Sequence, residues 1–398
     1  MPEHDLPPPP DPATDQAMLH IATKLVFGEN SIDTLGEHAQ ACGGGPALLV
    51  TDHGVAEVGH ADRALASLAK AGVEAILFEG VHENPTTMDV EQCLEVAKAS
   101  NIELFIGLGG GSPIDTARGC NFLFTNGGRM QDYWGVGKAS KAMKPMIAVP
   151  TTTGTGSEMQ SFALIADAET HQKMACGDKK AAAKVAILDP TLSCTQPRVV
   201  MAHTGLDCLG HALETAVTTK HTPFSRLFST EACRLVMKHF THILDEPMDL
   251  ESQGQMLLAS AFSGIAIEHS MLGAAHAMAN PLTAMFDVAH GEAVGMMLPH
   301  VMLFNSACDS ARDEYARLAV SSGLIAPDAS PQDAFDSLHQ KLVSILHHAG
   351  MPDSLTAHGV SGDSIESMVL SASKQWTGQF NPIPPTNDDF QAMYRAAL

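Results

Sequence analysis

The C-terminal half of the chain contains side chains that could ligate a metal ion. Asp207 and His211 lie four residues apart in "GLDCLGHALE" (205–214), a stretch with helical periodicity. Residues at i and i+4 share one helix face, so these two side chains could chelate the same ion. The alternative is that Asp207 and His211 are merely two polar residues on an ordinary packed helix.

Two further histidines follow in "GAAHAMANPLTAMFDVAHGEAVG", His276 near the end of an expected helix and His290 before a glycine. We expect Pro281 to break the helix between them, which lets the chain fold back and bring the two imidazoles together. Together with Asp207 and His211 they would make one carboxylate and three imidazoles, a set that suits Fe(II) or Zn(II). Because the chain contains 20 histidines, chance spacings of this kind stay an alternative.

A glycine-rich turn, "IGLGGGSPIDTA" (106–117), follows an apolar run and precedes a helical pattern. Gly110 and Gly111 remove side chains at the turn, Ser112 is expected to cap the helix, and Pro113 suits its first turn. The N–H groups at such a helix start can bind a pyrophosphate. The run lacks the GxGxxG spacing, so a tight turn without a ligand is an equal alternative from the glycines alone.

A second turn of this kind, "VPTTTGTGSE" (149–158), offers the hydroxyls of Thr151, Thr152 and Thr155. Ligands of open α/β sheets bind outside the carboxyl ends of the strands. Two such turns in one domain therefore favour a nucleotide cleft. Asp52, at the end of another apolar run, could accept the ribose hydroxyls of NAD, or could simply cap the next helix.

Composition excludes several classes of partner. The chain has 398 residues, with 23 basic and 45 acidic side chains and a formal net charge of −22. This charge disfavours nucleic acids and anionic membranes as partners. No apolar run reaches the roughly 18–20 residues of a membrane span, and the eight cysteines form no CxxC pair. We expect a cytoplasmic protein with reduced thiols.

The pattern along the chain predicts an α/β domain followed by an all-helical domain. Residues 1–17 are proline-rich and polar and should form a disordered tail. Between 18 and 195, continuously apolar runs alternate with helical patterns, which predicts a parallel sheet covered on both faces. From 196 to 398 strand-like runs are nearly absent. The expected strands are 47–51, 75–78, 104–108, 147–149 and 185–188, and the expected helices are 62–71, 88–99, 205–218, 224–240, 252–279, 310–321 and 331–348.

Five ordered motifs, "GGGSPIDTA", "VPTTTGTGSE", "ILDPTL", "HTGLDCLGHALE" and "HAMANPL…HGEAVGMMLPHV", resemble those of the iron-dependent (group III) alcohol dehydrogenases. The similarity extends from about residue 20 to the C-terminus. It implies a dinucleotide-binding domain and a helical domain of the dehydroquinate synthase-like architecture, with catalysis between them. It also implies that Asp207, His211, His276 and His290 bind one divalent metal, commonly Fe(II). Its cofactor contacts fall on Asp52, Asn84, Gly110, Gly111, Ser112, Thr151, Thr152, Thr155 and Lys173.

The activity that this resemblance implies is hydride transfer between NAD and a small alcohol or aldehyde, in a homodimer or larger homo-oligomer. The metal lowers the pKa of the alcohol, and the cofactor carries the redox step. One departure concerns Asn280, where most members of the family have a histidine. Asparagine does not titrate near neutrality, so the proton path is in question.

Other activities stay open from the sequence. A maleylacetate reductase or a hydroxyacid–oxoacid transhydrogenase would be a specialised relative. A lyase like dehydroquinate synthase would need a cluster of basic residues, and the motif regions hold few. A non-catalytic binding protein is disfavoured by the complete ligand set.

Overall fold

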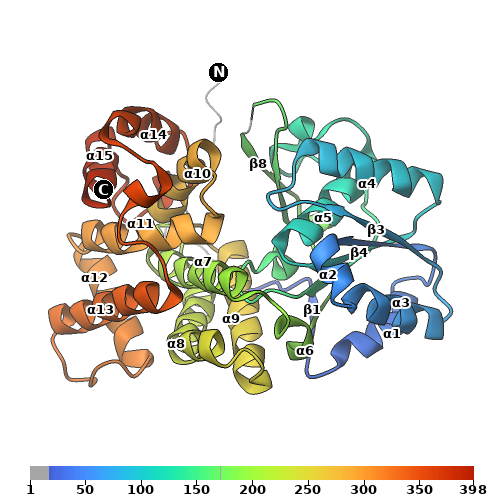
Figure 1. Ribbon diagram of the computed structural model, residues 1–398, viewed down its shortest axis with the longest axis horizontal. Helices are drawn as coiled ribbons and strands as arrows, with labels where there is room; N and C mark the ends of the chain where they lie inside the picture. Colours follow the sequence, from blue (N-terminus) through green and yellow to red (C-terminus); the bar gives the residue numbers. More distant parts are fainter. Residues whose placement is uncertain (1–17, 171) are drawn as a thin grey trace.

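The computed structural model describes residues 18–170 and 172–398. The proline-rich segment 1–17, expected to be a disordered tail, lies outside the described residues. Figure 1 shows an α/β lobe beside a helical lobe, with the long helices α7 and α9 at the side of the helical lobe that faces the sheet. The fold class predicted from the sequence is confirmed.

The α/β lobe is built from residues up to the start of α7. Its strands are β1 (Lys24–Phe27), β2 (Ala47–Asp52), β3 (Ala75–Val81), β4 (Leu104–Gly109), β5 (Gly135–Val136), β6 (Met146–Pro150), β7 (Phe162–Ala166), β8 (Lys173–Gly177) and β9 (Val185–Leu188). Its α-helices are α1 (Leu35–Ala41), α2 (His53–Glu57), α3 (His60–Lys70), α4 (Thr87–Ala99), α5 (Gly111–Asn126) and α6 (Pro190–Ser193). Its 3-10 helices are η1 (Ser31–Thr34), η2 (Met130–Tyr133), η3 (Ser157–Met159) and η4 (Lys179–Ala181).

The main sheet has six parallel strands in the order β1-β9-β6-β4-β2-β3. From β2 the chain moves outward to β3 and then returns to the other side of β2 to form β4, so the strand order reverses between β2 and β4. A reversal of this kind leaves a crevice at the carboxyl ends of the two strands, where open α/β sheets bind their ligands.

The strands of this sheet are apolar on both faces because helices cover both. Leu48 and Phe105 point into one core, shared with α4 and α5. Their neighbours Leu49 and Ile106 point into the opposite core, shared with α1 and α3. Side chains alternate along a strand, so two covered faces require apolar residues at every position. This explains the continuous apolar runs in the sequence.

Four strands were not expected from the sequence. β1 is a short edge strand, and β5, β8 and β7 form a separate three-stranded sheet in which β7 and β8 pair antiparallel. Two of the four give no long apolar run, since β5 has two residues and β1 is exposed at both ends, whereas β7 is the five-residue apolar run FALIA and was missed. Their pairing is therefore decided by tertiary contacts rather than by local pattern.

The helical lobe contains no strand, as predicted. Its helices are α7 (Arg198–Val217), α8 (Pro223–Asp245), α9 (Leu250–Glu268), α10 (Ala274–Phe286), α11 (His290–Asn305), α12 (Asp309–Ser321), α13 (Pro331–Ala349), η5 (Leu355–His358), η6 (Gly362–Ser364), α14 (Ile365–Ala372), η7 (Trp376–Phe380) and α15 (Asn387–Ala396). The helix α7 is buried along most of its length and contributes to the largest hydrophobic core of the protein.

Two expectations about these helices are wrong. The helix expected over 252–279 is two helices, since α9 ends at Glu268 and α10 begins at Ala274. Pro281 lies inside α10 and does not break it; the chain turns instead at Asp287, whose φ is +56°. Because most of α10 is buried, its packing outweighs the backbone hydrogen bond that proline cannot make. His276 is therefore in the first turn of its helix, not near the end.

The two lobes are joined by a hydrophobic contact between α9 and the sheet. Leu257 and Ala261 of α9 pack against Ala186 and Leu188 of β9. No helix of the described residues is long and apolar enough to cross a membrane.

Candidate metal centre and cofactor crevice

The four side chains proposed as metal ligands meet at one point of the helical lobe. The Oδ1 atom of Asp207 lies 3.4 Å from Nε2 of His211, 3.3 Å from Nε2 of His276 and 3.9 Å from Nε2 of His290. Asp207 and His211 come from α7, His276 from the start of α10 and His290 from the first residue of α11. The chain reversal expected between the two later histidines is therefore present, at Asp287 rather than Pro281.

The atoms that face this point lack hydrogen-bond partners. Oδ1 of Asp207 and Nε2 of His276 are both buried without one, although they lie within ion-pair distance of each other. Their contact does not have hydrogen-bond geometry, which means that both atoms face a shared space rather than each other. Ligand atoms of Asp207, His276 and His290 lie within 4.8 Å of one another. Buried polar atoms without partners are rare, and a divalent metal would satisfy them.

Two contacts behind the ligands hold the imidazoles in place. Nδ1 of His276 lies 2.5 Å from Oε2 of Glu214, which is 2% exposed and also accepts a bond of 2.6 Å from the N–H of Ala275. Nδ1 of His211 lies 3.3 Å from the carbonyl oxygen of Gly154. In each case Nδ1 is engaged and Nε2 is turned toward Asp207. Hydrogen bonds of this kind fix the tautomer and ring orientation of metal-ligating histidines.

Glu214 was not predicted from the sequence. It ends the same "GLDCLGHALE" stretch and lies three residues after His211, so it shares the helix face of Asp207 and His211. That spacing was a usable signal. Its partner Gly154 could not have been found in this way, because a backbone carbonyl leaves no trace in the pattern of residue types.

Electrostatic interactions decide which of these groups are charged. Burial opposes ionisation of Asp207, but the surrounding imidazoles of His211, His276 and His290 hold its pKa well below the usual range. Burial also opposes charge on His276, yet the carboxylates of Glu214 and Asp207 on either side of its ring raise its pKa to about 9. Burial lowers the pKa of His211 and of His290. The centre is thus a preformed anion that is ready to accept a cation.

The two glycine-rich turns lie against each other at the carboxyl ends of β4 and β6. A Cβ on Gly110 would come within 3.2 Å of Cγ2 of Thr152, and a Cβ on Gly111 within 3.2 Å of Cγ2 of Thr155. Oγ1 of Thr152 is buried without a hydrogen-bond partner. The absence of side chains at the two glycines therefore lets the threonines of the second turn pack against the start of α5.

Ser112 does not cap α5, contrary to expectation. The helix begins at Gly111, and its N-cap is Gly110, which has no side chain to accept a hydrogen bond. Ser112 lies inside the first turn with Pro113 beside it. The N–H groups at this helix start are therefore not satisfied by a side-chain cap, a state that suits anion binding.

Asp52 ends β2, next to β4, at the point where the strand order reverses. Its Oδ1 accepts a hydrogen bond of 2.9 Å from the N–H of Val55, which caps α2. Its Oδ2 faces Gly109, where an added Cβ would approach to 3.3 Å. The capping role considered from the sequence is therefore present, and the second oxygen faces the crevice. Thr151 is buried at the end of β6 in the same row of strand ends.

Asn84 and Lys173 are linked through Ala166 of β7. Asn84 adopts φ +52° in the loop before α4, and the next residue, Pro85, accepts a hydrogen bond from the N–H of Ala166. Ala166 pairs with Lys173 across β7 and β8. Burial lowers the pKa of Lys173, and the nearby carboxylates of Asp207 and Asp115 oppose that shift.

Asn280 lies one helical turn after His276 on α10 and is half-buried. Its Nδ2 donates a hydrogen bond of 2.9 Å to Oε1 of Gln375. The next residue, Trp376, stacks on Phe162 of the α/β lobe, with ring centroids 6.4 Å apart. The amide of Asn280 is thus fixed by a second amide rather than free.

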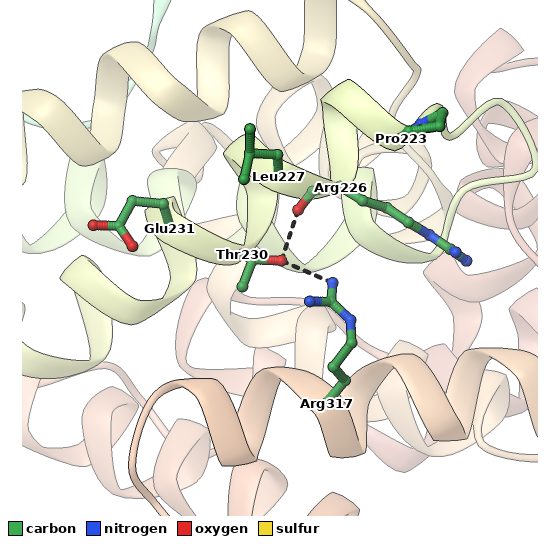
Figure 2. Close-up of a pocket in the computed structure, with 6 residues that line it drawn as sticks. All are labelled: Pro223, Arg226, Leu227, Thr230, Glu231 and Arg317. Atoms are coloured by element: carbon green, nitrogen blue, oxygen red, sulfur yellow. Dashed lines mark hydrogen bonds between the residues drawn. The ribbon is translucent and has the colours of Figure 1, made fainter. Parts of the chain in front are cut away.

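A surface cavity of about 330 Å³ lies elsewhere, between α8 and α12. Figure 2 shows the residues that line it, among them Arg317, whose guanidinium group reaches toward Thr230, and Arg226, whose guanidinium group points away from it. Thr230 donates to the carbonyl of Arg226 and accepts from Arg317. No residue of the metal centre or of the glycine turns lines this cavity, so it is a separate feature.

The fold and site together define an α/β lobe with two glycine-rich turns at its strand ends, beside a helical lobe in which one aspartate and three imidazoles converge. Comparison with known protein families agrees with this two-lobe description. Residues 22–190 match the model "Iron-containing alcohol dehydrogenase", and residues 201–398 match "Fe-containing alcohol dehydrogenase family, C-terminal". The chain belongs to the iron-containing alcohol dehydrogenase family. It is an alcohol dehydrogenase, an oxidoreductase.

Individual relatives match over nearly the full length. The chain is 33% identical to alcohol dehydrogenase 4 of Schizosaccharomyces pombe, covering 95% of this chain and 88% of the relative. It is 30% identical to 1,3-propanediol dehydrogenase of Klebsiella pneumoniae, covering 94% and 96%. The crystal structure of a 1,3-propanediol oxidoreductase superimposes with a TM-score of 0.91 at 30% identity, covering 94% and 98%.

Proposed function

We propose that the protein is an NAD-linked, metal-dependent dehydrogenase that interconverts a small alcohol and its aldehyde. The observation that carries this proposal is the convergence of three imidazoles on the unpartnered Oδ1 of Asp207, in the lobe that packs against the glycine turns. Asp207, His211, His276 and His290 would hold the metal, with Fe(II) first and Zn(II) or another divalent ion as alternatives.

A divalent metal in this set supplies a positive charge that stabilises negative charge on the substrate oxygen, and NAD supplies the hydride acceptor. The chain's own residues would orient these partners. Glu214 fixes the ring of His276, and the main chain of Gly154 fixes that of His211. Asn280, held by Gln375, would offer a neutral hydrogen-bonding group on the proton path, where a histidine could titrate.

NAD would lie across the crevice at the carboxyl ends of β2, β4 and β6. Gly110, Gly111 and Ser112 would bind its pyrophosphate, with Thr151, Thr152 and Thr155 beside them. Asn84 and Lys173 would contact its nicotinamide half. Relatives differ in cofactor, since an NAD-dependent methanol dehydrogenase of Bacillus methanolicus and an NADPH-dependent butanol dehydrogenase of Clostridium saccharobutylicum both match the chain.

The carboxylate of Asp52 favours NAD over NADP in this chain. Within residues 18–170 and 172–398 no group donates a hydrogen bond to its Oδ2, which lies beside Gly109, so this oxygen can accept from ribose hydroxyls and would repel a 2′-phosphate.

We further propose a division into residues 18–195, the dinucleotide-binding domain, and 196–398, the metal-binding domain. The family models, which end at 190 and resume at 201, support this boundary. A cytoplasmic homodimer or larger homo-oligomer is proposed from the family alone.

The experiment that tests the proposed function is NADH oxidation with a panel of small aldehydes under anaerobic conditions. Protein reconstituted with Fe(II) is compared with protein stripped by a chelator. Metal-dependent consumption of NADH is the expected result. No consumption with any aldehyde, in protein that demonstrably retains the metal, would contradict the proposal and direct attention to oxoacid substrates.

A further inference from the structure

The helix that carries His276 begins without a cap of its own. Its first residue is Ala274, and the residue before it, Gly273, has no side chain that can accept a hydrogen bond from the first turn. The start of this helix is fully buried, so its backbone N–H groups need partners from elsewhere in the protein. His276 is the third residue of α10, and whatever fixes the first turn therefore also fixes its imidazole.

Two side chains from other elements supply the missing acceptors. Oδ1 of Asn381 lies 3.3 Å from the backbone nitrogen of Ala274, although the two residues are 107 positions apart in the sequence. Oε1 of Glu214 lies 2.6 Å from the backbone nitrogen of Ala275. A Cβ on Gly273 would come within 2.9 Å of the Asn381 oxygen and 3.1 Å of the Glu214 oxygen. The glycine is therefore what lets both side chains reach the helix start.

Asn381 contacts α11 as well. Its Nδ2 donates a hydrogen bond of 2.6 Å to Oδ1 of Asn305, and Nδ2 of Asn305 donates one of 3.3 Å to Oδ1 of Asn381. Asn305 is the last residue of α11 and also donates to the hydroxyl of Tyr315 at 3.1 Å. Both amides are buried, with Asn381 1% and Asn305 0% exposed. Each amide thus fixes the orientation of the other.

This contact completes the support of α11. At its start, the helix lies directly against α7, since a Cβ on Gly291 would come within 2.0 Å of the carbonyl oxygen of His203. At its end, Asn305 is held by Asn381. The helix that begins with His290 is therefore fixed at both ends, which sets its direction relative to α10.

The main chain beside Asn381 is attached to α7. The carbonyl oxygen of Phe380 accepts a hydrogen bond of 2.8 Å from the N–H of Thr219 and one of 3.0 Å from the hydroxyl of Thr218. These threonines follow directly after α7, the helix that carries the other two proposed ligands. Two consecutive residues, Phe380 and Asn381, thus contact all three helices on which the four proposed ligands lie.

We propose that Asn381 is a positioning residue of the metal centre. Its amide joins the start of α10 to the end of α11, beside a carbonyl that is joined to α7, and so sets the approach of His276 to Asp207. The inference rests on the proposed function, because it assumes that the four side chains bind a divalent ion. Contacts behind metal ligands typically change metal affinity by about 10–100-fold, and Asn381 acts through a helix start, so about tenfold is expected.

Binding of Co²⁺ to the chelator-stripped, full-length protein tests this role. Competition with a chromophoric chelator measures the affinity, and the visible absorption bands of the bound ion report its coordination geometry. Asn381→Ala and Asn305→Ala should each bind Co²⁺ about tenfold more weakly than the unaltered protein, with altered absorption bands. Urea unfolding of the metal-free proteins measures stability separately, and circular dichroism checks that each variant is folded. The two variants lie on different elements, so a folding defect in one leaves the other informative.

Gln253→Ala is the matched control, because Gln253 is also a fully buried amide, which donates to the carbonyl oxygen of Pro247 at 2.8 Å. It lies on α9, which carries none of the proposed ligands. This variant should lose stability but keep the Co²⁺ affinity and absorption bands of the unaltered protein.

Unchanged affinity and bands in both Asn381→Ala and Asn305→Ala would overturn the positioning role, whatever their loss of stability. An equal loss of affinity in Gln253→Ala would overturn it too, because any buried amide would then have the same effect. Absence of Co²⁺ binding in the unaltered protein would contradict the proposed function itself, and this inference with it. The failure of the inference alone is therefore distinguishable from the failure of the proposed function.

Discussion

Two buried carboxylates in this protein behave in opposite ways. Asp207 and Glu158 are 6% and 0% exposed, and each has at least one oxygen without a hydrogen-bond partner. The pKa of Asp207 is held well below its usual range, whereas burial raises the pKa of Glu158 to about 7. Three imidazoles surround Asp207. At Glu158 only the N–H of its own backbone and the attraction of Arg118 oppose the loss of solvation, and no imidazole contributes.

The comparison of Asp207 with Glu158 shows that burial of a carboxyl group does not by itself indicate a functional site. Burial by itself drives a carboxyl group toward its neutral form, because the charged form loses its hydration. Converging imidazoles reverse that effect and leave an anion whose lone pairs face a shared space. A metal centre is therefore identified by what surrounds the buried acid rather than by its burial.

The largest effect is expected from Asp207→Asn, which keeps the size of the side chain and removes its charge. The variant should lose its bound metal, and turnover should fall by roughly 10³-fold or more, since several kcal/mol of charge stabilisation disappear. Metal content and NADH oxidation measure both. NAD binding, followed by fluorescence titration, should be retained. Glu158→Gln is the counterpart and should keep its metal; if both variants lost it, the distinction drawn between the two acids would fail.

Glu214→Gln tests whether orientation of His276 contributes to the metal centre. The amide fills the same space but removes the charge that raises the pKa of His276, so metal affinity should fall about 10–100-fold. Competition with a chromophoric chelator measures that affinity. Glu74→Gln, at an exposed position, is the control and should bind as tightly as the unaltered protein. Equal affinities in the two variants would show that Glu214 does not position the ligand.

Glu158 makes stability depend on pH. Its carboxyl group has a pKa of about 7 in the folded protein and 4.5 as an ordinary side chain. Between these values the unfolded chain releases a proton that the folded protein keeps, so the free energy of unfolding falls as the pH rises, by about 1–3 kcal/mol. Glu158→Gln removes this loss and should be more stable than the unaltered protein at pH 8, with little difference at pH 4.5.

Urea unfolding of the metal-free proteins at the two pH values measures this change. Glu74→Gln, which alters an exposed carboxylate, should show no such gain at pH 8. If Glu158→Gln lost as much stability between pH 4.5 and pH 8 as the unaltered protein does, Glu158 would not be the cause of the pH dependence.

Asp52 is a third case, a carboxylate partnered by one backbone N–H. Asp52→Asn keeps a residue that can cap α2 while removing the charge that faces the crevice. We expect the preference for NAD over NADP to fall by about tenfold, because the repulsion of the 2′-phosphate is lost. The ratio of kcat/KM for the two cofactors measures it. Asp52→Gly, which also loses the cap, should relax the preference similarly but at lower thermal stability. An unchanged ratio in both would refute the ribose contact.

The smallest change is expected from Asn280→His. A histidine at this position would titrate near pH 6.5, whereas the amide does not. The variant should therefore gain an ionisation in the pH profile of kcat, with a change of only about a few-fold at the optimum. The comparison variant is Gln375→Glu, at the hydrogen-bond partner of Asn280. Asn305→His is not used for this purpose because Asn305 is fully buried. Identical profiles for Asn280→His and the unaltered protein would remove this position from the proton path.

Much of this architecture was predictable because its signals are local. The apolar runs at 47–51 and 104–108 became central strands, since a strand covered on both faces needs apolar residues at every position. The four-residue spacing of Asp207 and His211 placed both on one helix face. The glycine turns at 110–111 and 151–155 came together because the carboxyl ends of neighbouring parallel strands meet at one edge.

The errors arose where tertiary packing overrides local preference. Pro281 lies inside α10, and the reversal toward His290 occurs at Asp287. The helix expected over 252–279 ends at Glu268, and the short strands β5 and β8 gave too weak a pattern to find. In each case burial and partner strands, not residue propensity, decided the conformation.

The sequence by itself determined the order of the two lobes and the glycine turns, because helix and strand periods place side chains on known faces. The four proposed ligands followed from the family resemblance, and spacing alone had left them open. Only the tertiary structure decided which acids gained partners. It brought the imidazoles of α10 and α11 to Asp207, set Glu214 behind His276, and left Glu158 with neither oxygen hydrogen-bonded. Charge on a buried acid depends on neighbours far apart in the chain, and no local spacing specifies them.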